Sequence, residues 1–149
     1  MKTTTMNEAS IAKFVAAWFQ ALDFHVPIEQ AYGLLSSDNL RMHFPDGEIT
    51  DFDTFKQWYD RVTNLFFDEN HYVNEVKASI DGDVATLDIL VGWQASMWEP
   101  PQPKSRRVSM DATQIWTVRA SEQNSFGMVI ESYNATAAPF VYAPGFARL

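Results

Sequence analysis

The sequence predicts an α+β fold in which a long, curved antiparallel or mixed sheet is covered by about three N-terminal helices. Apolar residues recur at helical spacing up to residue 66, whereas long runs after residue 71 alternate between apolar and polar residues. Aromatic residues are abundant, with 11 Phe, 5 Trp and 5 Tyr among 149 residues, more than packing alone requires. We therefore expect the sheet to bend around the helices and enclose an aromatic pocket.

Length and charge exclude several classes of protein. A chain of 149 residues fits one domain, and its net charge of −8 argues against nucleic-acid and anionic-membrane partners. No apolar run reaches the roughly 18 residues of a membrane-spanning helix. The absence of cysteine excludes disulfides and a thiol nucleophile. Because Glu8 and Lys13 interrupt the apolar N-terminus, we expect no secretion signal and a cytoplasmic protein.

Three helices are expected before residue 66. Thr5 and Glu8 fit a capping box for the first helix. Pro27 fits the first position of a short second helix, and Asp51 or Asp53 fits the cap of the third. The inward stripes of the first and third helices comprise Ile11, Phe14, Val15, Trp18 and Leu22, and Phe55, Trp58, Tyr59, Val62, Leu65 and Phe66.

Five strands are expected, four of them after residue 70. They comprise residues 40–44, 71–80, 84–98, 106–119 and 126–136. The Asp81-Gly82 pair indicates a tight hairpin, and the proline-rich residues 99–103 indicate a loop. We expect a single domain over residues 1–136 and an irregular tail over residues 137–149.

The two longest strands predict their own register. If residues 99–104 join neighbouring strands, Trp93 lies opposite Met110 and Ile89 opposite Gln114, so that their apolar faces coincide. Gln114 is then a lone polar residue on the inner face. Asp111 falls on the outer face unless a bulge shifts the register.

His71 reaches the inner face only if its strand contains a bulge. Without one, Tyr72 would point inward and Val73 outward. We favour a bulge at residues 74–75, which places His71 beside Trp93 on the inner face.

His71 is the main catalytic candidate, because an imidazole can act as a general base near neutral pH. The alternatives are a surface residue or a core histidine hydrogen-bonded to a carboxylate such as Asp46. Asp46 itself also fits a turn before Gly47.

Other residues are candidates for ligand contact. Gln114 can donate a hydrogen bond to a ligand carbonyl or be satisfied by neighbouring backbone. The tryptophans fit core positions by spacing, although some must line any hollow. The expected ligand-binding residues are Gln114, Trp58, Trp93, Trp98, Trp116, Tyr133 and Phe44. The three histidines lack metal-ligand spacing, so we expect neither a metal nor a cofactor.

Several stretches resemble SnoaL-like proteins of the nuclear transport factor 2-like superfamily. They comprise residues 18–22, 32–38, 42–47, 55–59 and 71–95. The resemblance lies in the overall pattern and extends to Thr136. It implies a curved sheet with three covering helices, a deep pocket and frequent homodimers. The superfamily includes isomerases, cyclases, dehydratases, epoxide hydrolases and non-catalytic binding modules, so the fold alone selects no function.

The resemblance argues against steroid isomerase chemistry. In those isomerases an Asp base precedes a Pro on the first strand, where this chain has Phe44 before Pro45. Their first-helix Tyr maps near Trp18 or Phe19, and their protonated Asp maps to Gln114. Without these groups, proton abstraction would lose its main electrostatic support.

The dehydratase and cyclase branches use a His, often with an Asp or a Tyr, which His71 with Asp46 or Tyr59 would match. We therefore expect a cofactor-independent lyase, cyclase or isomerase that acts on a small hydrophobic oxygenated molecule. His71 would move the proton and Gln114 would polarise a carbonyl. The alternative is a non-catalytic module for ligand binding or dimerisation. By analogy with the family, a homodimer is expected.

Overall fold

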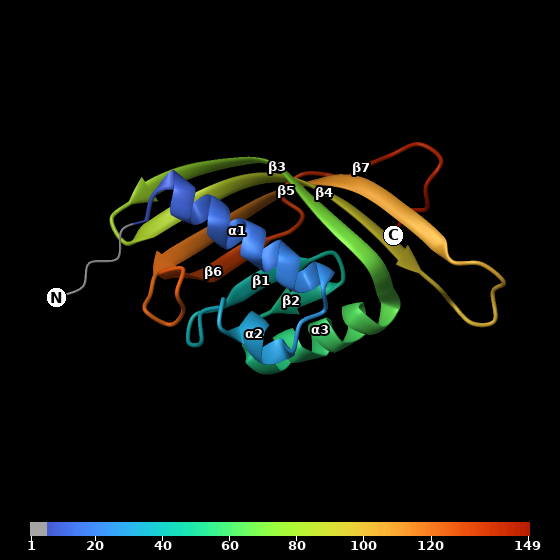
Figure 1. Ribbon diagram of the computed structural model, residues 1–149, viewed down its shortest axis with the longest axis horizontal. Coiled ribbons are helices and arrows are strands. Elements are labelled where there is room, and N and C mark those ends of the chain that lie inside the picture. The colour runs from blue at the N-terminus through green and yellow to red at the C-terminus, as the bar shows by residue number, and fades with distance from the viewer. Residues whose placement is uncertain (1–5) are drawn as a thin grey trace.

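The computed structural model describes residues 6–149 and confirms the α+β class (Figure 1). The helices are α1 (Glu8–Asp23), α2 (Ile28–Tyr32) and α3 (Phe52–Leu65). The strands are β1 (Arg41–Phe44), β2 (Gly47–Ile49), β3 (Phe66–Asp81), β4 (Val84–Met97), β5 (Arg106–Ala120), β6 (Met128–Asn134) and β7 (Val141–Tyr142). Two strands were not expected: β2 and β7, which have only three and two residues.

The helix starts follow local capping chemistry. The side chain of Asn7 accepts a hydrogen bond from the backbone of Ser10 and caps α1. Thr5, the expected cap, lies outside the described residues, and Glu8 is the first residue of α1 rather than its third. Asp51 caps α3 through Thr54, as one of the two predicted alternatives.

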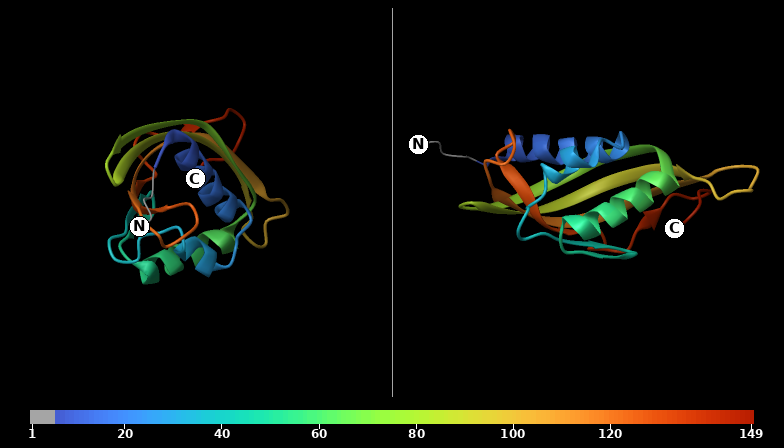
Figure 2. Two further views of the ribbon diagram at one scale, coloured as in Figure 1. Left: turned by 60° about the vertical axis from the view of Figure 1, so that its left-hand side comes forward. Right: turned by 90° about the horizontal axis from the view of Figure 1, so that it is seen from below.

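The strands form one sheet in the order β2-β1-β6-β5-β4-β3, with β7 added beside β5. β1 and β6 run parallel, whereas the other neighbours are antiparallel. The sheet curves around the helices, which lie on its concave side (Figure 2). This arrangement follows from the long alternating strands, whose apolar faces all need the same cover.

The predicted register is confirmed. Trp93 pairs with Met110, Ile89 pairs with Gln114, and Asp111 pairs with Gly92 on the outer face. β3 has the expected irregularity between Val73 and Glu75 and places His71 opposite Trp93. It also has a second bulge, between Phe67 and Asn70, which the sequence did not predict.

β3 begins earlier than expected, because Phe66 starts the strand rather than ending the helix stripe. The last long strand is shorter than the expected 126–136 and covers Met128–Asn134. The tail over residues 137–149, expected to be irregular, contributes β7 and a bridge from Ala147 to Val108.

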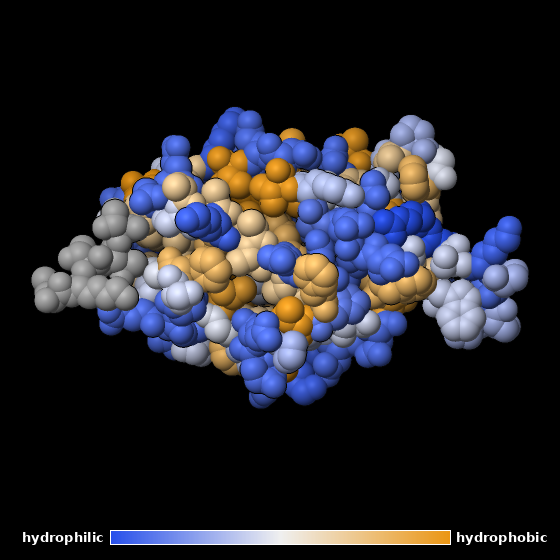
Figure 3. Space-filling view, in the orientation of Figure 1, coloured by the Kyte–Doolittle hydropathy of each residue, from blue (hydrophilic) through white to orange (hydrophobic). Residues whose placement is uncertain are grey.

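The main core lies between the helices and the concave face of the sheet. Its largest fully buried side chains include Trp18, Phe14, Phe55 and Trp116. On the helix-bearing side, apolar residues are interspersed with hydrophilic ones, and the projecting β4–β5 hairpin is mostly hydrophilic or neutral (Figure 3). No helix within residues 6–149 combines the length and apolar character needed to cross a bilayer.

Candidate functional site

A cavity of about 330 Å³ lies between α3 and the concave face formed by β3, β4, β5 and β6. Its wall is mainly aromatic and aliphatic, as in many small-molecule sites. Eight of the predicted site residues border it: Phe44, Asp46, Trp58, Tyr59, His71, Trp93, Gln114 and Tyr133. The tail also contributes Phe140 and Leu149.

Two tryptophans expected to contact a ligand lie elsewhere. Trp98 is 47% exposed on the β4–β5 hairpin, where its indole donates to the carbonyl of Gln102 at 2.6 Å. Trp116 is fully buried behind the cavity and packs on the ring of Tyr133 at a centroid distance of 4.8 Å. The spacing placed Trp116 on the inner face correctly, but the ring of Tyr133, which stacks on it, borders the cavity and Trp116 does not.

His71 is paired with a carboxylate, although not with the expected Asp46. Its Nδ1 lies 2.5 Å from Oδ1 of Asp23, and its backbone N–H donates to Oδ2 of the same residue at 3.0 Å. Asp23 is the last residue of α1, and the sequence marked it only as a break in the helical pattern. The ring of His71 stacks on Phe19 at 4.7 Å.

The pairing defines the chemistry of His71. An ionised carboxylate only accepts hydrogen bonds, so Nδ1 carries the proton that Asp23 accepts. Nε2 is then the nitrogen available to a ligand, with its lone pair free when the ring is neutral. The side chain of His71 is only 10% exposed and borders the cavity. This arrangement suits a general base.

Asp46 and Tyr59 border the cavity but are engaged by other residues. Asp46 accepts hydrogen bonds from Arg61 at 2.6 and 3.1 Å, and both side chains are about half exposed. The hydroxyl of Tyr59 donates to the carbonyl of Val26 at 2.5 Å. Burial raises the pKa of Tyr59, and the negative charge of Glu69 raises it further. Among the described residues, the hydrogen-bond partner of the His71 imidazole is therefore Asp23 rather than Asp46 or Tyr59.

Two neutral polar groups lie at the floor of the cavity. The amide oxygen of Gln114 accepts a hydrogen bond from the indole of Trp116 at 3.0 Å. The hydroxyl oxygen of Tyr133 accepts one from the indole of Trp18 at 3.3 Å. The side chain of Gln114 also hydrogen-bonds Tyr133, which engages part of its amide NH₂. Because an indole N–H can only donate, the rest of that NH₂ and the O–H of Tyr133 keep donor capacity. Burial raises the pKa of Tyr133, which keeps its phenol protonated.

A second histidine–carboxylate pair adjoins the cavity, and the sequence did not predict it. Nε2 of His25 lies 2.5 Å from Oε2 of Glu69, whose other oxygen accepts a hydrogen bond from the indole of Trp93 at 3.1 Å. Glu69 lies within the unexpected bulge of β3, so simple alternation gave no sign that it faces inward. Within residues 6–149, no three His, Asp or Glu side chains gather closely enough to hold a metal ion.

Comparisons with known proteins identify the fold. No family model matches the chain, and no curated protein matches it in sequence. A protein of unknown function with a cystatin-like fold from Nostoc punctiforme matches over 100% of both chains, with 14% identity and a TM-score of 0.70.

Two further solved structures have names that refer to chemistry. The hexachlorocyclohexane dehydrochlorinase LinA-type3 of Novosphingobium barchaimii shows 11% identity and a TM-score of 0.73, over 95% of this chain and 92% of its own. A Streptomyces avermitilis protein of the NTF2-like family, provisionally named a dehydratase, shows 12% identity and a TM-score of 0.71, over 87% and 96%. At such identities these likenesses identify the fold alone. The chain has the cystatin-like α+β fold of NTF2-like proteins.

Proposed function

We propose that the chain is a SnoaL-like protein that binds a small, largely apolar oxygenated molecule in this cavity and removes a proton from it with His71. The reaction class is that of a cofactor-independent lyase, cyclase or isomerase. The observation that carries the proposal is the Asp23–His71 pair beside an aromatic cavity. In the domain organisation that we propose, residues 1–136 form the domain and residues 137–149 its tail.

The pair supplies a base in a fixed orientation. Asp23 holds the Nδ1–H of His71 and stabilises the imidazolium that forms when Nε2 takes a proton from a carbon of the ligand. The stacked ring of Phe19 limits rotation of the imidazole. The structural neighbours include proteins named as a dehydrochlorinase and, provisionally, a dehydratase, and loss of a proton fits both names.

The floor of the cavity supports the same chemistry. Removing a proton beside a carbonyl places negative charge on its oxygen, and two donors aimed at that oxygen lower the barrier. In our proposal, the amide NH₂ of Gln114 and the O–H of Tyr133 supply these donors. Neither donor carries a charge, so an uncharged ligand can approach them without burying a second ion.

Deuterium exchange tests the proposal. Native mass spectrometry identifies a molecule that co-purifies with the protein, and this molecule is then incubated with the protein in D₂O. We expect the wild type to introduce deuterium at one carbon and His71→Gln to bind the molecule without exchange. His43→Gln, which alters an exposed histidine on β1, is the matched control. Binding without exchange by the wild type would instead favour a non-catalytic binding module.

A second proposal concerns the outer face of the sheet, where we propose that a second copy of this chain docks. Four large apolar side chains are exposed there: Tyr72 and Val141 end a row across the strands that also holds Gly92 and Asp111, and Leu90 and Ile115 lie nearby. An apolar patch of this kind is typical of an interface. The resemblance to a family with frequent homodimers favours a copy of the same chain as the partner.

Analytical ultracentrifugation at micromolar concentration tests this dimer. We expect the wild type and Ile80→Lys to sediment as dimers and Ile115→Lys as a monomer. Ile80 and Ile115 are 42% and 43% exposed, so the two variants place the same charge at equally exposed positions. A monomeric wild type would refute the dimer and leave the proposal for the cavity unaffected.

A further inference from the structure

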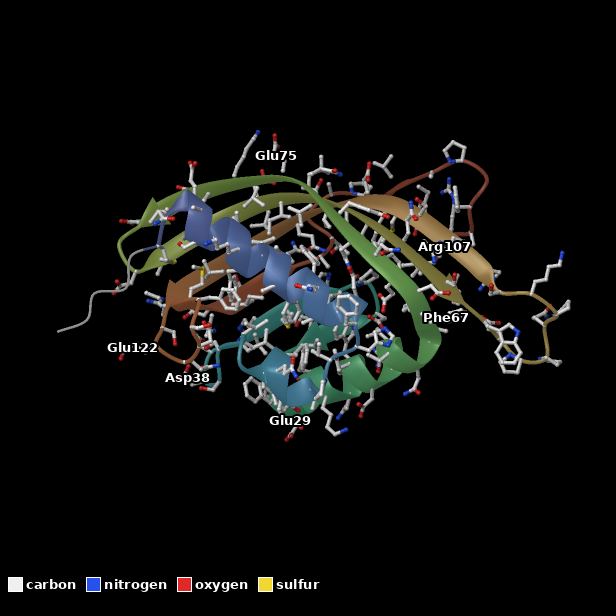
Figure 4. The ribbon with its side chains drawn as sticks, viewed as in Figure 1. Glu29, Asp38, Phe67, Glu75, Arg107 and Glu122 are labelled. Carbon is white, nitrogen blue, oxygen red and sulfur yellow. The ribbon has the colours of Figure 1, made fainter. Side chains whose placement is uncertain are left out.

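The bulge at the start of β3 turns Glu69 into the cavity. Asp68 has φ 51°, a left-handed conformation that costs free energy for a residue other than glycine. Arg107 holds this conformation from β5: its Nη1 donates to the carbonyl of Asp68 at 2.8 Å and to Oγ of Ser96 at 3.0 Å. Figure 4 shows Arg107 beside the stretch of β3 that carries Phe67. As a result, Glu69 and His71 both border the cavity.

Glu69 retains acceptor capacity towards the cavity. A carboxylate offers about four lone-pair positions, and the described partners of Glu69 use two of them, through His25 and Trp93. Its side chain is only 9% exposed. His25 also has a positive φ, 47°, so an unusual backbone conformation lies at one partner of this pair and directly before the other. Conformations of this kind persist where the surroundings enforce them, and they are common at functional sites.

The charges around the cavity disfavour an anionic ligand. Glu69 borders the cavity and is paired with the imidazole of His25, and Asp23 on α1 is paired with the imidazole of the cavity-lining His71. The arginine of the cavity, Arg61, is paired with Asp46 and is half exposed, so it offers little compensation for a buried anion. A ligand carboxylate near Glu69 would experience like-charge repulsion in a site that water screens poorly.

We propose that Glu69 selects the ligand: it accepts a hydrogen bond from a hydroxyl group of an uncharged molecule and disfavours molecules that carry a carboxylate. The inference rests on the proposed function in one respect, namely that the ligand occupies this cavity. Combined with the donors of Gln114 and Tyr133, it names a substrate class, an uncharged hydroxylated carbonyl compound with an apolar body. The carbonyl lies at the floor, and the hydroxyl lies at the β3 wall.

Three probes with one carbon skeleton test the selection: 2-naphthalenemethanol, its methyl ether and 2-naphthoate. The alcohol and the ether differ in the hydrogen-bond donor, and the alcohol and the carboxylate differ in charge. Affinities are measured by isothermal titration calorimetry, and the indole resonance of Trp93 in ¹H–¹⁵N spectra locates each probe. A hydrogen bond to a charged acceptor corresponds to roughly tenfold in affinity. We expect the wild type to bind the alcohol roughly tenfold more tightly than the ether, and the carboxylate most weakly.

Variants assign the preference to Glu69. Glu69→Gln removes the charge, so the advantage of the alcohol over both other probes should fall several-fold. Glu131→Gln is the matched control, because Glu131 is a poorly exposed carboxylate on β6 that pairs with Arg119 and does not border the cavity. It should keep the wild-type order. If Glu69→Gln does not fold, the role of Glu69 is judged from the order of the three wild-type affinities and from the shift of the Trp93 indole resonance on binding.

The outcomes separate this inference from the proposed function. Probes that bind at Trp93 with equal affinity for alcohol and ether, or with the carboxylate bound most tightly, would overturn the role of Glu69 alone. An unchanged order in Glu69→Gln would do the same. If none of the three probes bound the wild type, both the role of Glu69 and the cavity as a ligand site would be overturned.

Discussion

The floor of the cavity, at Gln114 and Tyr133, and its β3 wall, at Glu69 and His71, differ in their hydrogen-bonding groups. At the floor, the indoles of Trp18 and Trp116 donate to Tyr133 and Gln114, which keep donor capacity of their own. At the wall, Asp23 holds His71 and Glu69 holds His25, which leaves acceptor capacity on His71 and Glu69. The difference teaches that the partners behind the lining residues decide whether each region offers donors or acceptors.

The largest effect on stability should come from removing Trp116, which packs behind the floor of the cavity. Trp116→Ala removes a fully buried indole and should lower the free energy of unfolding by about 3–5 kcal/mol. Trp98→Ala, at an exposed hairpin position, should cost less than about 1.5 kcal/mol, mainly through its hydrogen bond to Gln102. Urea denaturation measures both values. Equal costs for the two variants would contradict the assignment of Trp116 to the floor.

A smaller effect should come from the wall. Asp23→Asn removes the charge from a largely buried pair and should lower the free energy of unfolding by about 1–2 kcal/mol. Asp46→Asn breaks a half-exposed ion pair with Arg61 and should cost less than about 1 kcal/mol. Chemical denaturation of the two variants compares them directly. A larger cost for Asp46→Asn would restore Asp46 as the important carboxylate.

The pH dependence of stability should distinguish the floor from the wall. Burial raises the pKa of Tyr133 above its ordinary 10.0, so the unfolded chain releases this proton first as the pH rises. The contribution of Tyr133 is therefore complete below pH 10 and is lost above it, by about 1 kcal/mol between pH 10 and pH 11. Denaturation at both pH values should show a smaller decline for Tyr133→Phe. An identical decline would show that Tyr133 does not titrate as a buried group.

The smallest effect concerns the bulge. Arg107→Met should release the Asp68 carbonyl and shift the Trp93 indole resonance by weakening its bond to Glu69. Arg119→Met, which removes another β5 arginine that pairs with Glu131, should leave that resonance in place. Arg107→Met/Asp68→Gly should restore the wild-type signal, since glycine adopts a positive φ without steric cost. If the Trp93 indole resonance did not shift in Arg107→Met, the proposed link from Arg107 to Glu69 would be contradicted.

The sequence predicts the floor better than the wall, and the reason is periodicity. Strict alternation in β4 and β5 places Gln114 on the inner face. At the wall, the same reasoning predicts the bulge beside Glu75 and so the inward position of His71, but not the partner of His71. Asp23 is different, because only the docking of α1 against β3 brings it to His71. No local sequence pattern predicts this contact between residues that lie far apart in the chain.

Glu69 and Asp46 show two other limits. The bulge that turns Glu69 inward depends on a left-handed Asp68, where the sequence offers no glycine as a signal. Asp46 was only one candidate partner for His71, and it also fitted a turn before Gly47; it lies in the turn between β1 and β2 and pairs with Arg61 on α3. The short strand β2 was not predicted, because three residues carry too little alternation to indicate a strand.

The placement of the five tryptophans makes intrinsic tryptophan fluorescence a useful probe of the cavity. Trp58 and Trp93 border the cavity, Trp18 and Trp116 lie behind its floor, and Trp98 projects into solvent on the hairpin. Replacing Trp98 with phenylalanine would confine the tryptophan fluorescence to indoles that border the cavity or lie just behind its floor. Emission wavelength and quenching would then report occupancy of that space without an attached label.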